Sequence, residues 1–389
     1  MYRPTYIKID GNILENNIKN IISNYPDYKY YIGVVKNNAY HHGIYAIKYL
    51  INSGVNYLAV SSLEEALQAR KYNSTIPILV LEPIKSEYIF DAISNNITLT
   101  IGSLEEATKV SELKISDDLK IHLKIDSGMN RLGFKNKKDL KQAFDILSEI
   151  KHVEVEGIYT HLATSGIQDP KYNEQVSNFK EIVSPIDLNK IPIIHVDRSL
   201  TFSHHEKLDF CNGVRMGIAM YGFEQNISAG NFINSLRRRL NQRKFSIENV
   251  TLNTKLSLDY AFSLYSEVME VRVAKKGEFC GYGMEYVFKE ESYVATIPVG
   301  YADGVTKSFG FVYINGKRYK IIAECMDMIM VEVDKSVHVG DVVEIIGKNQ
   351  NIKTIGNRLG LSGYKALNVF TTRIPIVYEY NGETIEIKY

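Results

Sequence analysis

Charged residues at the ends of short apolar runs are the first feature of this sequence that could do chemistry. Lys36 ends such a run in VVKNNAYHHG, and Arg215 lies between apolar neighbours in VRMGIAMYG. A lysine in an apolar run is costly unless it is paired or its pKa is lowered, and a lysine of lowered pKa is the form that makes Schiff bases. The alternative is structural, with Lys36 reaching solvent or pairing with Asp126. Spacing alone leaves both roles open.

Other polar residues also follow apolar runs. They are Lys124 and Arg131 in HLKIDSGMNRLGF, His161 in YTHLATS and Ser199 in HVDRS. Tyr282, in CGYG, is a different case, because a tyrosine with a pKa of about 10 is a poor base unless nearby positive charge lowers that pKa. GYG is also typical of a turn with a packed aromatic ring, so Tyr282 alone does not indicate catalysis.

Histidines offer a metal site in principle. The candidates form two adjacent pairs: His41, His42, His204 and His205. Adjacent side chains point in divergent directions in most backbones, and no HExxH motif or acidic cluster accompanies them. We therefore expect no metal ion.

The composition limits the class of protein. A chain of 389 residues predicts two domains. Lys and Arg total 46 and Asp and Glu 45, and a net charge of +1 argues against a nucleic-acid binder that relies on bulk positive charge. Three widely spaced cysteines, Cys211, Cys280 and Cys325, predict neither a disulfide framework nor a CxxC site. Because no apolar run reaches about 18 residues and none resembles a secretory signal, we expect a cytoplasmic protein with no membrane span.

The elements that must position these residues alternate regularly over the first 225 residues. Ser62–Tyr72 and Ser103–Leu113 have helical period, and each begins with a capping box, Ser followed three residues later by Glu. Eight strands are predicted, at Tyr31–Lys36, Tyr57–Ser61, Ile76–Leu81, Ile97–Ile101, Leu119–Ile125, Val153–Thr160, Ile191–Val196 and Val214–Tyr221. This pattern predicts an α/β fold, a (β/α)₈ barrel of TIM type with functional residues at the C-terminal strand ends. An open doubly wound sheet is the alternative, although no GxGxxG follows the first strand.

The pattern changes after about residue 226. Strands with turn signals are predicted at Glu267–Val273, Tyr293–Pro298, Phe311–Tyr313, Tyr319–Ala323, Met328–Val333 and Val342–Ile346. Asn315-Gly316 and Asn381-Gly382 are hairpin signals. We predict a barrel domain over 1–228, an inter-domain connection over 229–258 and an all-β domain over 259–389. The run Arg237–Arg239 in the connection is interpreted as a solvated helix face.

Taken together, the motifs carry a resemblance to a known family. VVKNNAYHHG resembles the pyridoxal 5'-phosphate (PLP) lysine motif of bacterial alanine racemases, which are fold-type-III PLP enzymes. The match continues in the family's order through SGMNRLGF, YTHLATS, VRMGIAMYG, GEFCGYG, VGYADG, ECMDM and SGYKALNVFTTRIP. These segments cover nearly the whole chain. The resemblance implies an N-terminal (β/α)₈ barrel with a C-terminal β domain, in agreement with the pattern of predicted strands.

The resemblance implies a racemase that interconverts L- and D-alanine with two bases. Lys36 would hold PLP as a Schiff base and act on one face of the substrate Cα, and Tyr282 of the partner subunit would act on the other. The protein would therefore be a homodimer with shared active sites. Arg215 would face the pyridine nitrogen, where a permanently charged guanidinium disfavours ring protonation and so limits side reactions. That suits a racemase better than a transaminase.

The remaining implied roles are binding roles. Arg131 would contact the cofactor's phenolic oxygen and the substrate carboxylate, Lys124 matches a position that is often carbamylated, and His161 would lie beside the ring. The phosphate would be bound by Tyr40, Ser199, Tyr364 and the backbone N–H groups of Gly217 and Ile218. Met326 would contact the substrate carboxylate from the partner subunit, and Tyr301 would stand at the channel mouth. By resemblance the product would be D-alanine for the cell wall.

The sequence departs from the family pattern at Arg198, where Asn is usual, at Asn37 and His41, where small residues are usual, and at Lys365, where Glu is common. Our hypothesis is that Arg198 and the altered lysine loop broaden or shift specificity, for instance toward serine. Two further alternatives remain open. A fold-type-III decarboxylase would not need Tyr282 paired with Arg215. A non-catalytic PLP-binding protein would lack the C-terminal domain.

Overall fold

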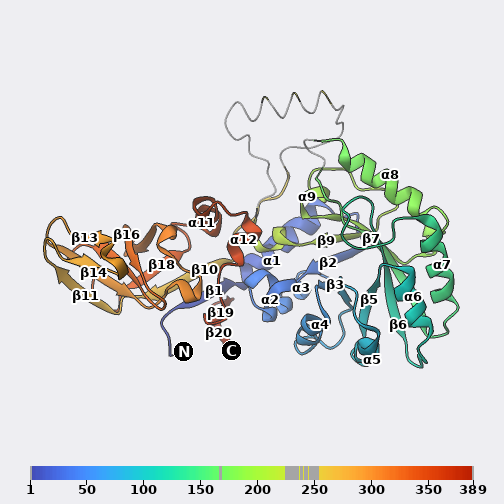
Figure 1. Cartoon of the computed structure of the whole chain (residues 1–389), viewed down its shortest axis with the longest axis horizontal. Coiled ribbons are helices and arrows are strands. Elements are labelled where there is room, and N and C mark those ends of the chain that lie inside the picture. Colours follow the sequence, from blue (N-terminus) through green and yellow to red (C-terminus); the bar gives the residue numbers. More distant parts are fainter. Residues whose placement is uncertain are drawn as a thin grey trace.

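The chain is described here from a computed structural model, which covers residues 2–165, 169–223 and 254–387, with residues 236, 240 and 244 between them. Its two parts lie side by side along the long axis, the barrel at one end and a sheet domain at the other (Figure 1). The predicted connection, 229–258, falls mostly outside the described residues, and Arg237–Arg239 falls wholly outside them. No helix among the described residues is long and apolar enough to cross a membrane.

Eight parallel strands close into a barrel, which confirms the predicted fold class. The strands are β2 (Tyr30–Val34), β3 (Tyr57–Val60), β4 (Ile78–Val80), β5 (Ile97–Ile101), β6 (Leu119–Ile125), β7 (Val153–Thr160), β8 (Ile193–Arg198) and β9 (Gly213–Met216). β2 pairs with both β3 and β9, so the sheet has no edge. β3, β4 and β5 are buried along their whole length, as expected for strands covered on both faces.

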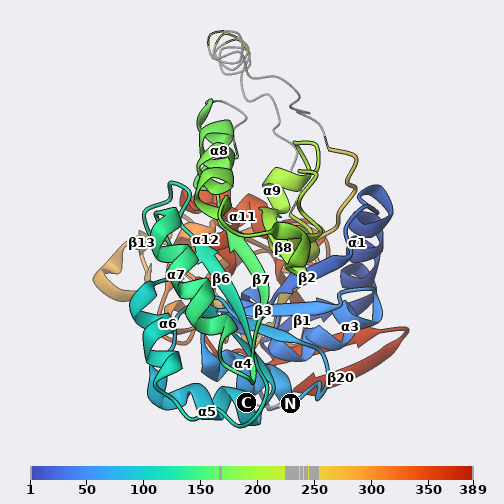
Figure 2. The same ribbon diagram turned by 90° about the vertical axis from the view of Figure 1, so that its right-hand side faces the viewer.

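Helices cover the outside of the barrel (Figure 2). They are α1 (Gly11–Asn24), α3 (Ile47–Asn52), α4 (Leu63–Arg70), α5 (Ile89–Ser94), α6 (Leu104–Ser111), α7 (Lys137–Ser148) and α8 (Lys171–Val183), with α9 (Ser199–Phe202) after β8. The predicted capping serines are confirmed, since Ser62 accepts a hydrogen bond from the Glu65 N–H at 3.4 Å and Ser103 accepts one from Glu106 at 3.2 Å.

Two of the predicted barrel strands end two or more residues earlier than expected. β2 stops at Val34, so Lys36 lies beyond the strand and opens the short turn α2 (Lys36–His41). β9 stops at Met216, because Gly217, with φ −115° and ψ −113°, leaves the extended conformation and a 3₁₀ turn, η4 (Ile218–Tyr221), follows. Both chain segments therefore bend at the C-terminal end of the barrel, where the functional residues were predicted.

The first strand, β1 (Tyr6–Asp10), was not predicted. It pairs antiparallel with β10 (Phe262–Glu267) and parallel with β19 (Ile376–Tyr380), both in the C-terminal half of the chain. The predicted barrel domain starts at residue 1, whereas the structure places these first residues in the other sheet. Asp10 then caps α1, accepting from the N–H groups of Asn12 and Ile13, which turns the chain from this sheet into the barrel.

The C-terminal part is a ten-stranded sheet in the order β11-β14-β17-β16-β15-β18-β10-β1-β19-β20. The strands not yet given are β11 (Glu270–Ala274), β14 (Ser292–Ile297), β15 (Phe311–Ile314), β16 (Lys317–Glu324), β17 (Ile329–Val333), β18 (Val342–Ile346) and β20 (Glu383–Ile387). Both hairpin signals are confirmed, because Asn315 and Asn381 have φ of 51° and join β15 to β16 and β19 to β20.

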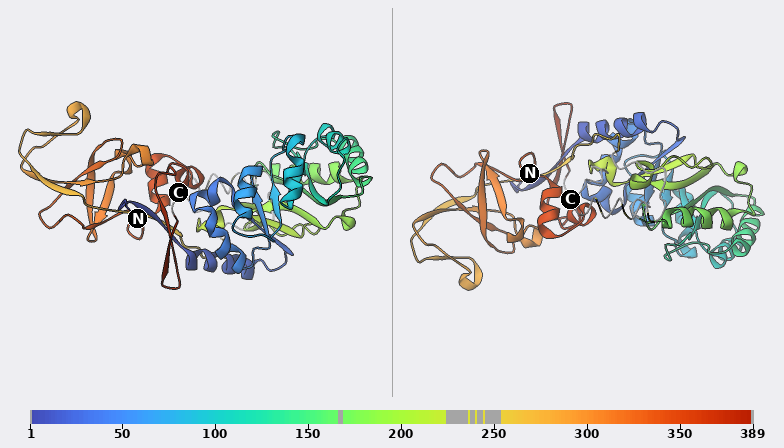
Figure 3. Two further views of the ribbon diagram at one scale, coloured as in Figure 1. Left: turned by 90° about the horizontal axis from the view of Figure 1, so that it is seen from below. Right: turned by 90° about the horizontal axis from the view of Figure 1, so that it is seen from above.

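Two features of this part bear on function. Two short helices, α11 (Ile352–Leu359) and α12 (Gly363–Leu367), were not predicted and lie between the sheet and the barrel (Figures 1 and 3). A two-stranded ribbon, β12 (Phe279–Cys280) with β13 (Tyr286–Val287), lies at the end of the molecule away from the barrel (Figure 1).

Candidate active site

A cavity of about 600 Å³ opens where the barrel strands end. That volume is within the range of about 300–1,000 Å³ for small-molecule sites. Of the predicted site residues, those lining it are Lys36, Tyr40, Lys124, Arg131, His161, Ser199, Arg215, Gly217 and Tyr364. The structure does not bring Ile218, Tyr282, Tyr301 or Met326 to its wall. The side chain of Ile218 is buried instead, and the role predicted for Ile218 used its backbone N–H.

The backbone that presents Lys36 is strained. Asn37, Asn38, Ala39, Tyr40 and His41 all have φ between 52° and 66°, a run of five non-glycine residues in the left-handed region. Each costs roughly 1–2 kcal/mol relative to the right-handed form, so such a run persists only where its surroundings determine it. Strain of this kind directly after Lys36 indicates that its position matters.

Three contacts hold this turn. The Asn37 N–H donates to Glu65 Oε1 at 2.6 Å, and the Ile44 N–H donates to the side-chain oxygen of Asn38 at 2.8 Å. On the far side, the Tyr378 hydroxyl donates to the backbone oxygen of His42 at 2.7 Å. Because Glu65 lies on α4 and Tyr378 on β19, both the barrel and the C-terminal sheet fix the segment that carries Lys36.

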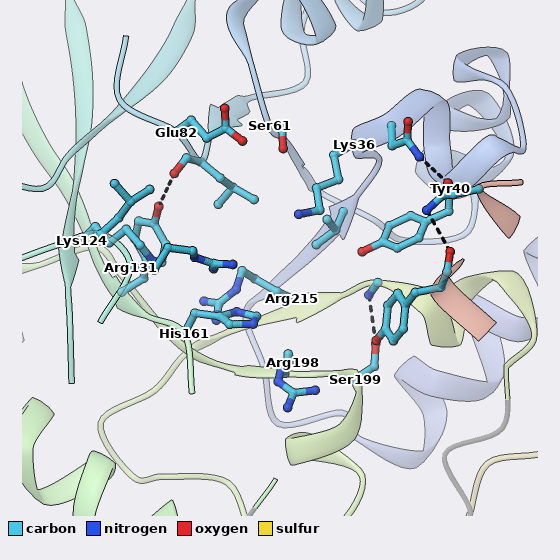
Figure 4. Close-up of a pocket in the computed structure, with 18 residues that line it drawn as sticks. Lys36, Tyr40, Ser61, Glu82, Lys124, Arg131, His161, Arg198, Ser199 and Arg215 are labelled. Atoms are coloured by element: carbon cyan, nitrogen blue, oxygen red, sulfur yellow. Dashed lines mark hydrogen bonds between the residues drawn. The ribbon is translucent and has the colours of Figure 1, made fainter. Parts of the chain in front are cut away.

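Positive charge gathers across the cavity from Lys36, where Lys124, Arg131 and Arg215 lie (Figure 4). Lys124, on β6, is 5% exposed, and burial together with Arg215 and Arg131 lowers its pKa to about 7. The carboxylate of Asp126 accepts from the N–H groups of Gly128 and Asn130 rather than from the lysine. Among the described residues that line the cavity, Glu82 is the single carboxylate (Figure 4), so this cluster of cations suits an anionic ligand.

Arg215 is the most firmly held of these groups. One terminal nitrogen donates to His195 Nδ1 at 2.7 Å and to the His195 backbone oxygen at 2.6 Å. The other donates to the backbone oxygens of Thr160 at 2.7 Å and Val196 at 2.9 Å. Burial lowers its pKa to about 10, so the guanidinium stays charged at neutral pH. Arg215 is therefore a charged group held in a fixed position in the cavity wall.

Behind Arg215 a chain of hydrogen bonds runs through the barrel core, and the sequence analysis missed it. Since Arg215 can only donate, His195 accepts at Nδ1 and donates from Nε2 to His122 Nδ1 at 2.9 Å. His122 then donates from Nε2 to Glu156 at 3.2 Å. Glu156 also accepts from Lys120 at 2.5 Å, and these donors lower its pKa to about 2 despite its burial.

His122 and His195 are both neutral, because burial lowers the pKa of each imidazole. The sequence signal was the alternation of Lys120, His122 and Lys124 along β6, which places all three on one face of a strand. That face is the barrel interior.

Tyr159 is a second residue that the sequence analysis missed. It lies two positions before His161 along the chain and lines the cavity with it. Its ring stacks on His195 with centroids 4.6 Å apart, and Lys124 Nζ lies 4.5 Å from the ring centroid.

His161 also lines the cavity. Burial, together with Arg215 and other cations, lowers the pKa of His161 to about 2. The imidazole of His161 is therefore neutral.

Hydroxyl groups form the opposite end of the cavity. Ser199 Oγ accepts from the Gly217 N–H at 3.0 Å, which leaves its own hydrogen available. A Cβ on Gly217 would lie 3.1 Å from the Tyr40 hydroxyl, so glycine keeps this space open. Burial raises the pKa values of Tyr40 and Tyr364, whose rings lie 6.0 Å apart, and both phenols are neutral donors. Such donors suit an anion with several oxygens.

The departures from the family pattern take three different places. Arg198 lines the cavity beside Ser199 (Figure 4), and Asn37 lines its rim, where its side chain donates to Asn368. His41 is buried in the left-handed turn against Phe370 and does not line the cavity. Lys365 is exposed on α12.

Three predicted residues lie in the C-terminal part instead. Tyr282 is 77% exposed in the turn between β12 and β13, and Tyr301 and Met326 are 46% and 54% exposed. The Tyr301 N–H donates to the Cys325 backbone oxygen at 3.2 Å. A Cβ on Gly300 would lie 2.5 Å from the Met326 oxygen, so the two loops touch backbone to backbone.

The turn that carries Tyr282 is tied to the segment that follows Tyr301, because the Glu285 carboxylate pairs with Lys307 at 2.6 Å. The structure thus places Tyr282, Tyr301 and Met326 on adjoining loops that do not line the cavity. No group of three or more His, Cys, Asp or Glu side chains in the described part of the chain is arranged to hold a metal ion.

Comparison with known proteins now identifies the family. The model of the alanine racemase N-terminal domain matches residues 9–225, and that of the alanine racemase C-terminal domain matches residues 261–378. The chain belongs to the alanine racemase family. It is 32% identical to alanine racemase 1 of Bacillus subtilis (strain 168), over 100% of this chain and 96% of that protein.

Solved structures agree with this family assignment. Alanine racemase of Clostridium difficile 630 matches with a TM-score of 0.87 and 30% identity, over 100% of this chain and 99% of that one. Histidine racemase from Leuconostoc mesenteroides subsp. sake matches with a TM-score of 0.82 and 26% identity, over 97% and 98% of the two chains. The protein is an amino-acid racemase of a PLP-dependent family, and relatives with this fold carry more than one substrate in their names.

Proposed function

We propose that this family member is a PLP-dependent racemase that interconverts L- and D-alanine. The observation that carries the proposal is the pairing, within one cavity, of a lysine on a strained turn with a fixed guanidinium, Lys36 and Arg215. A carboxylate in place of Arg215 would favour a protonated cofactor ring, and the guanidinium disfavours it. This arrangement supports racemisation over transamination.

The residues present fit PLP. The hydroxyls of Tyr40, Ser199 and Tyr364, with the Ile218 N–H, would hold the phosphate. The Gly217 N–H, which donates to Ser199 Oγ in the structure, would share its hydrogen with the phosphate. Gly217 supports this assignment, because a side chain there would fill the space beside the Tyr40 hydroxyl. Arg215 would face the pyridine nitrogen, His161 would lie beside the ring, and Arg131 would bind the phenolic oxygen. Lys36 would be the amine that attaches the cofactor.

When bound to the amino group of a substrate, PLP would acidify the hydrogen on Cα. The Lys36 amine would remove or return that proton on one face of the carbon. A second group must serve the opposite face, because the configuration inverts only if the proton leaves from one side and returns on the other. Tyr282 would be that group, and its hydroxyl would exchange a proton with the same carbon.

Within one chain Tyr282 stands on a ribbon at the end of the molecule away from the barrel (Figure 1). We therefore propose a homodimer in which Tyr282, Tyr301 and Met326 enter the partner's cavity. The surface around Tyr282 supports this, since apolar side chains cluster there: Phe279, Met284, Val287 and Met326 are all more than half exposed. A contiguous exposed apolar patch is a common feature of protein–protein interfaces.

Arg131 would bind the substrate carboxylate together with the partner's Met326 N–H. Lys124 lies beside this arginine, and its pKa of about 7 leaves a large fraction of neutral amine near neutral pH. We propose that this amine adds CO₂, forming an N–C bond and releasing one proton to solvent. The carbamate would replace repulsion between two cations by attraction. Carbon-13 spectroscopy of enzyme equilibrated with labelled bicarbonate tests this, with Lys124→Met as the control.

The central experiment follows exchange of the Cα hydrogen in D₂O for a panel of L- and D-amino acids in the presence of PLP. We expect exchange with loss of optical rotation for alanine, and weaker exchange for serine and histidine. Release of CO₂ from lysine, ornithine or diaminopimelate would instead support a decarboxylase. The absence of exchange with every small amino acid would contradict the proposed function.

A further inference from the structure

Arg198 is a charged side chain in the cavity that the proposed chemistry does not use. It stands where β8 gives way to α9, directly before Ser199, and lines the cavity. Its backbone is fixed, because its N–H donates to Thr201 Oγ1 at 2.8 Å and its carbonyl accepts from the same hydroxyl at 3.1 Å. Its side-chain Nε, by contrast, is buried and has no hydrogen-bond partner among the residues that the structure describes.

The charge of Arg198 is also uncompensated. Among the described residues no carboxylate forms an ion pair with it, and its pKa is lowered by burial. The groups that oppose this lowering are two phenols, Tyr364 and Tyr40. Another cation, Arg215, lies close enough to interact with it. A partly buried guanidinium with neither a neighbouring anion nor a full set of acceptors among the described residues is costly, so this end of the cavity suits an anion.

Position distinguishes the two anions that could bind. A substrate carboxylate would lie near Arg131 and Lys124, and Figure 4 shows these residues at one end of the cavity. Arg198 lies beside Ser199 and below His161 (Figure 4). The groups that raise its pKa are the phenols of Tyr364 and Tyr40 at the hydroxyl end of the cavity. A phosphate monoester carries about −1.5 to −2 charges near pH 7 and three strong acceptor oxygens. The hydroxyls of Ser199, Tyr40 and Tyr364 supply neutral donors for those oxygens, and a guanidinium supplies the missing charge.

We propose that Arg198 binds the phosphate group of PLP and retains the cofactor, so that it serves the cofactor rather than the choice of amino acid. This inference rests on the proposed use of PLP. This role is favoured over a role of Arg198 in specificity, because the phenols that act on its charge, Tyr364 and Tyr40, belong to the hydroxyl end of the cavity. An arginine placed this way gives the phosphate a charged donor in addition to the hydroxyl and backbone groups.

The test titrates the apoenzyme with PLP and, separately, with pyridoxal, which lacks the phosphate, and follows the visible absorbance of the bound cofactor. Hydrogen bonds to charged groups contribute about 1.5–3 kcal/mol, which corresponds to about 10- to 100-fold in affinity. We expect Arg198→Asn and Arg198→Gln to weaken PLP binding by that factor and to leave pyridoxal binding unchanged. Arg198→Lys should retain part of the PLP affinity because it keeps the charge.

Lys365→Asn is the matched control, because it removes a cation beside Tyr364 that does not line the cavity. It should bind PLP as the wild type does. Equal weakening of PLP and pyridoxal in the Arg198 variants, or no weakening of PLP, would overturn the inference. Unchanged pyridoxal binding also shows that a variant is folded, and Arg198→Lys provides a second variant if Arg198→Asn does not fold. Failure of the wild-type apoenzyme to take up PLP would instead contradict the proposed function.

Discussion

The two groups of proposed catalytic residues differ in how firmly their own chain holds them. Arg215 is 4% exposed and donates four hydrogen bonds to groups in the barrel. Tyr282 is 77% exposed, and its hydroxyl bonds to nothing in the part of the chain that the structure describes. Lys36 stands with the first group, on a turn braced by two domains.

This difference separates what one chain completes from what it leaves unfinished. The barrel end is pre-organised, so the groups that would hold the cofactor need little rearrangement to bind it. The loops that carry Tyr282, Tyr301 and Met326 are tied to one another but face solvent. Their side chains gain a defined position only when a second surface covers them, which is why we attribute that half of the site to a dimer.

Loss of Lys36 should have the largest effect on the pre-organised half. Lys36→Ala removes both the amine that attaches the cofactor and the proton acceptor on one face of Cα. We expect racemisation to fall by more than about 10⁴-fold, beyond the usual contribution of one general base, and the visible absorbance of bound cofactor to shift. Polarimetry and absorbance measure these changes. Lys85→Ala, at an exposed lysine outside the cavity, is the control, and a loss of less than tenfold in Lys36→Ala would contradict the role.

Loss of Tyr282 should have a smaller effect, and it tests the incomplete half. Tyr282→Phe removes one general acid or base, so we expect a loss of about 10²- to 10⁴-fold. Exchange from one face of Cα should be impaired more than exchange from the other. Hydrogen exchange in D₂O, followed separately for L- and D-alanine, distinguishes the faces.

The dimer itself can be tested by mixing the two variants. If each site takes Lys36 from one chain and Tyr282 from its partner, a hybrid of Lys36→Ala and Tyr282→Phe chains contains one site with both groups intact. Co-expressed, differently tagged chains should therefore recover activity that neither variant has alone. No recovery in purified hybrids would show that the site is completed within one chain.

Lys124 offers a pH-dependent prediction. Its pKa is about 7 in the folded protein and about 10.4 in an unfolded chain. Between these values the unfolded chain binds a proton that the folded one does not, so the free energy of unfolding should rise with pH across this window. Below about pH 7 the cost of burying the charge is fully present.

Lys124→Met should therefore be more stable than the wild type at pH 6, by a few kcal/mol, and this advantage should shrink toward pH 10. Urea unfolding of the apoenzyme in CO₂-free buffer gives the free energies. Lys120→Met is the comparison on the same strand, because Lys120 pairs with Glu156. A stability difference between Lys124→Met and wild type that stays constant with pH would exclude titration of Lys124 as its cause.

The sequence predicted the fold well because periodicity and burial dominate a closed parallel barrel. β5 and β6 have the predicted bounds, and both Asn-Gly hairpins form where predicted. β1 was missed, because nothing local shows that a five-residue strand will pair with partners some 250 and 370 positions away. The early end of β2 was missed for a different reason, since the left-handed turn after Lys36 contains no glycine to signal it.

For the candidate site, motif order predicted most of the residues that line the cavity. It did not predict Tyr159, His122 or Glu156, because His122 lies on β6 and the other two on β7, and no local pattern connects the two strands. Alternation along β6 places His122 inside the barrel, but its partner His195 lies on β8, and only closure of the barrel brings the two rings within hydrogen-bond distance, at 2.9 Å. Arg198 was noticed as a departure from the family pattern, but only the structure gave its neighbours.

The smallest predicted effect concerns the support behind Arg215. His195→Phe keeps a flat ring but removes the acceptor for the guanidinium and the donor to His122. Buried polar groups left without partners cost about 1–3 kcal/mol, so the melting temperature of the apoenzyme should fall. Arg215 still has its three backbone acceptors, so we expect PLP affinity to change less than stability. His152→Phe is the control for the substitution, because His152 is partly exposed and takes no part in the hydrogen bonds between Arg215, His195, His122 and Glu156. An unchanged melting temperature would show that the hydrogen bonds from His195 to His122 and Glu156 do not stabilise the barrel end. The firmer hold on Arg215 than on Tyr282 would then come from the backbone acceptors of Arg215 alone.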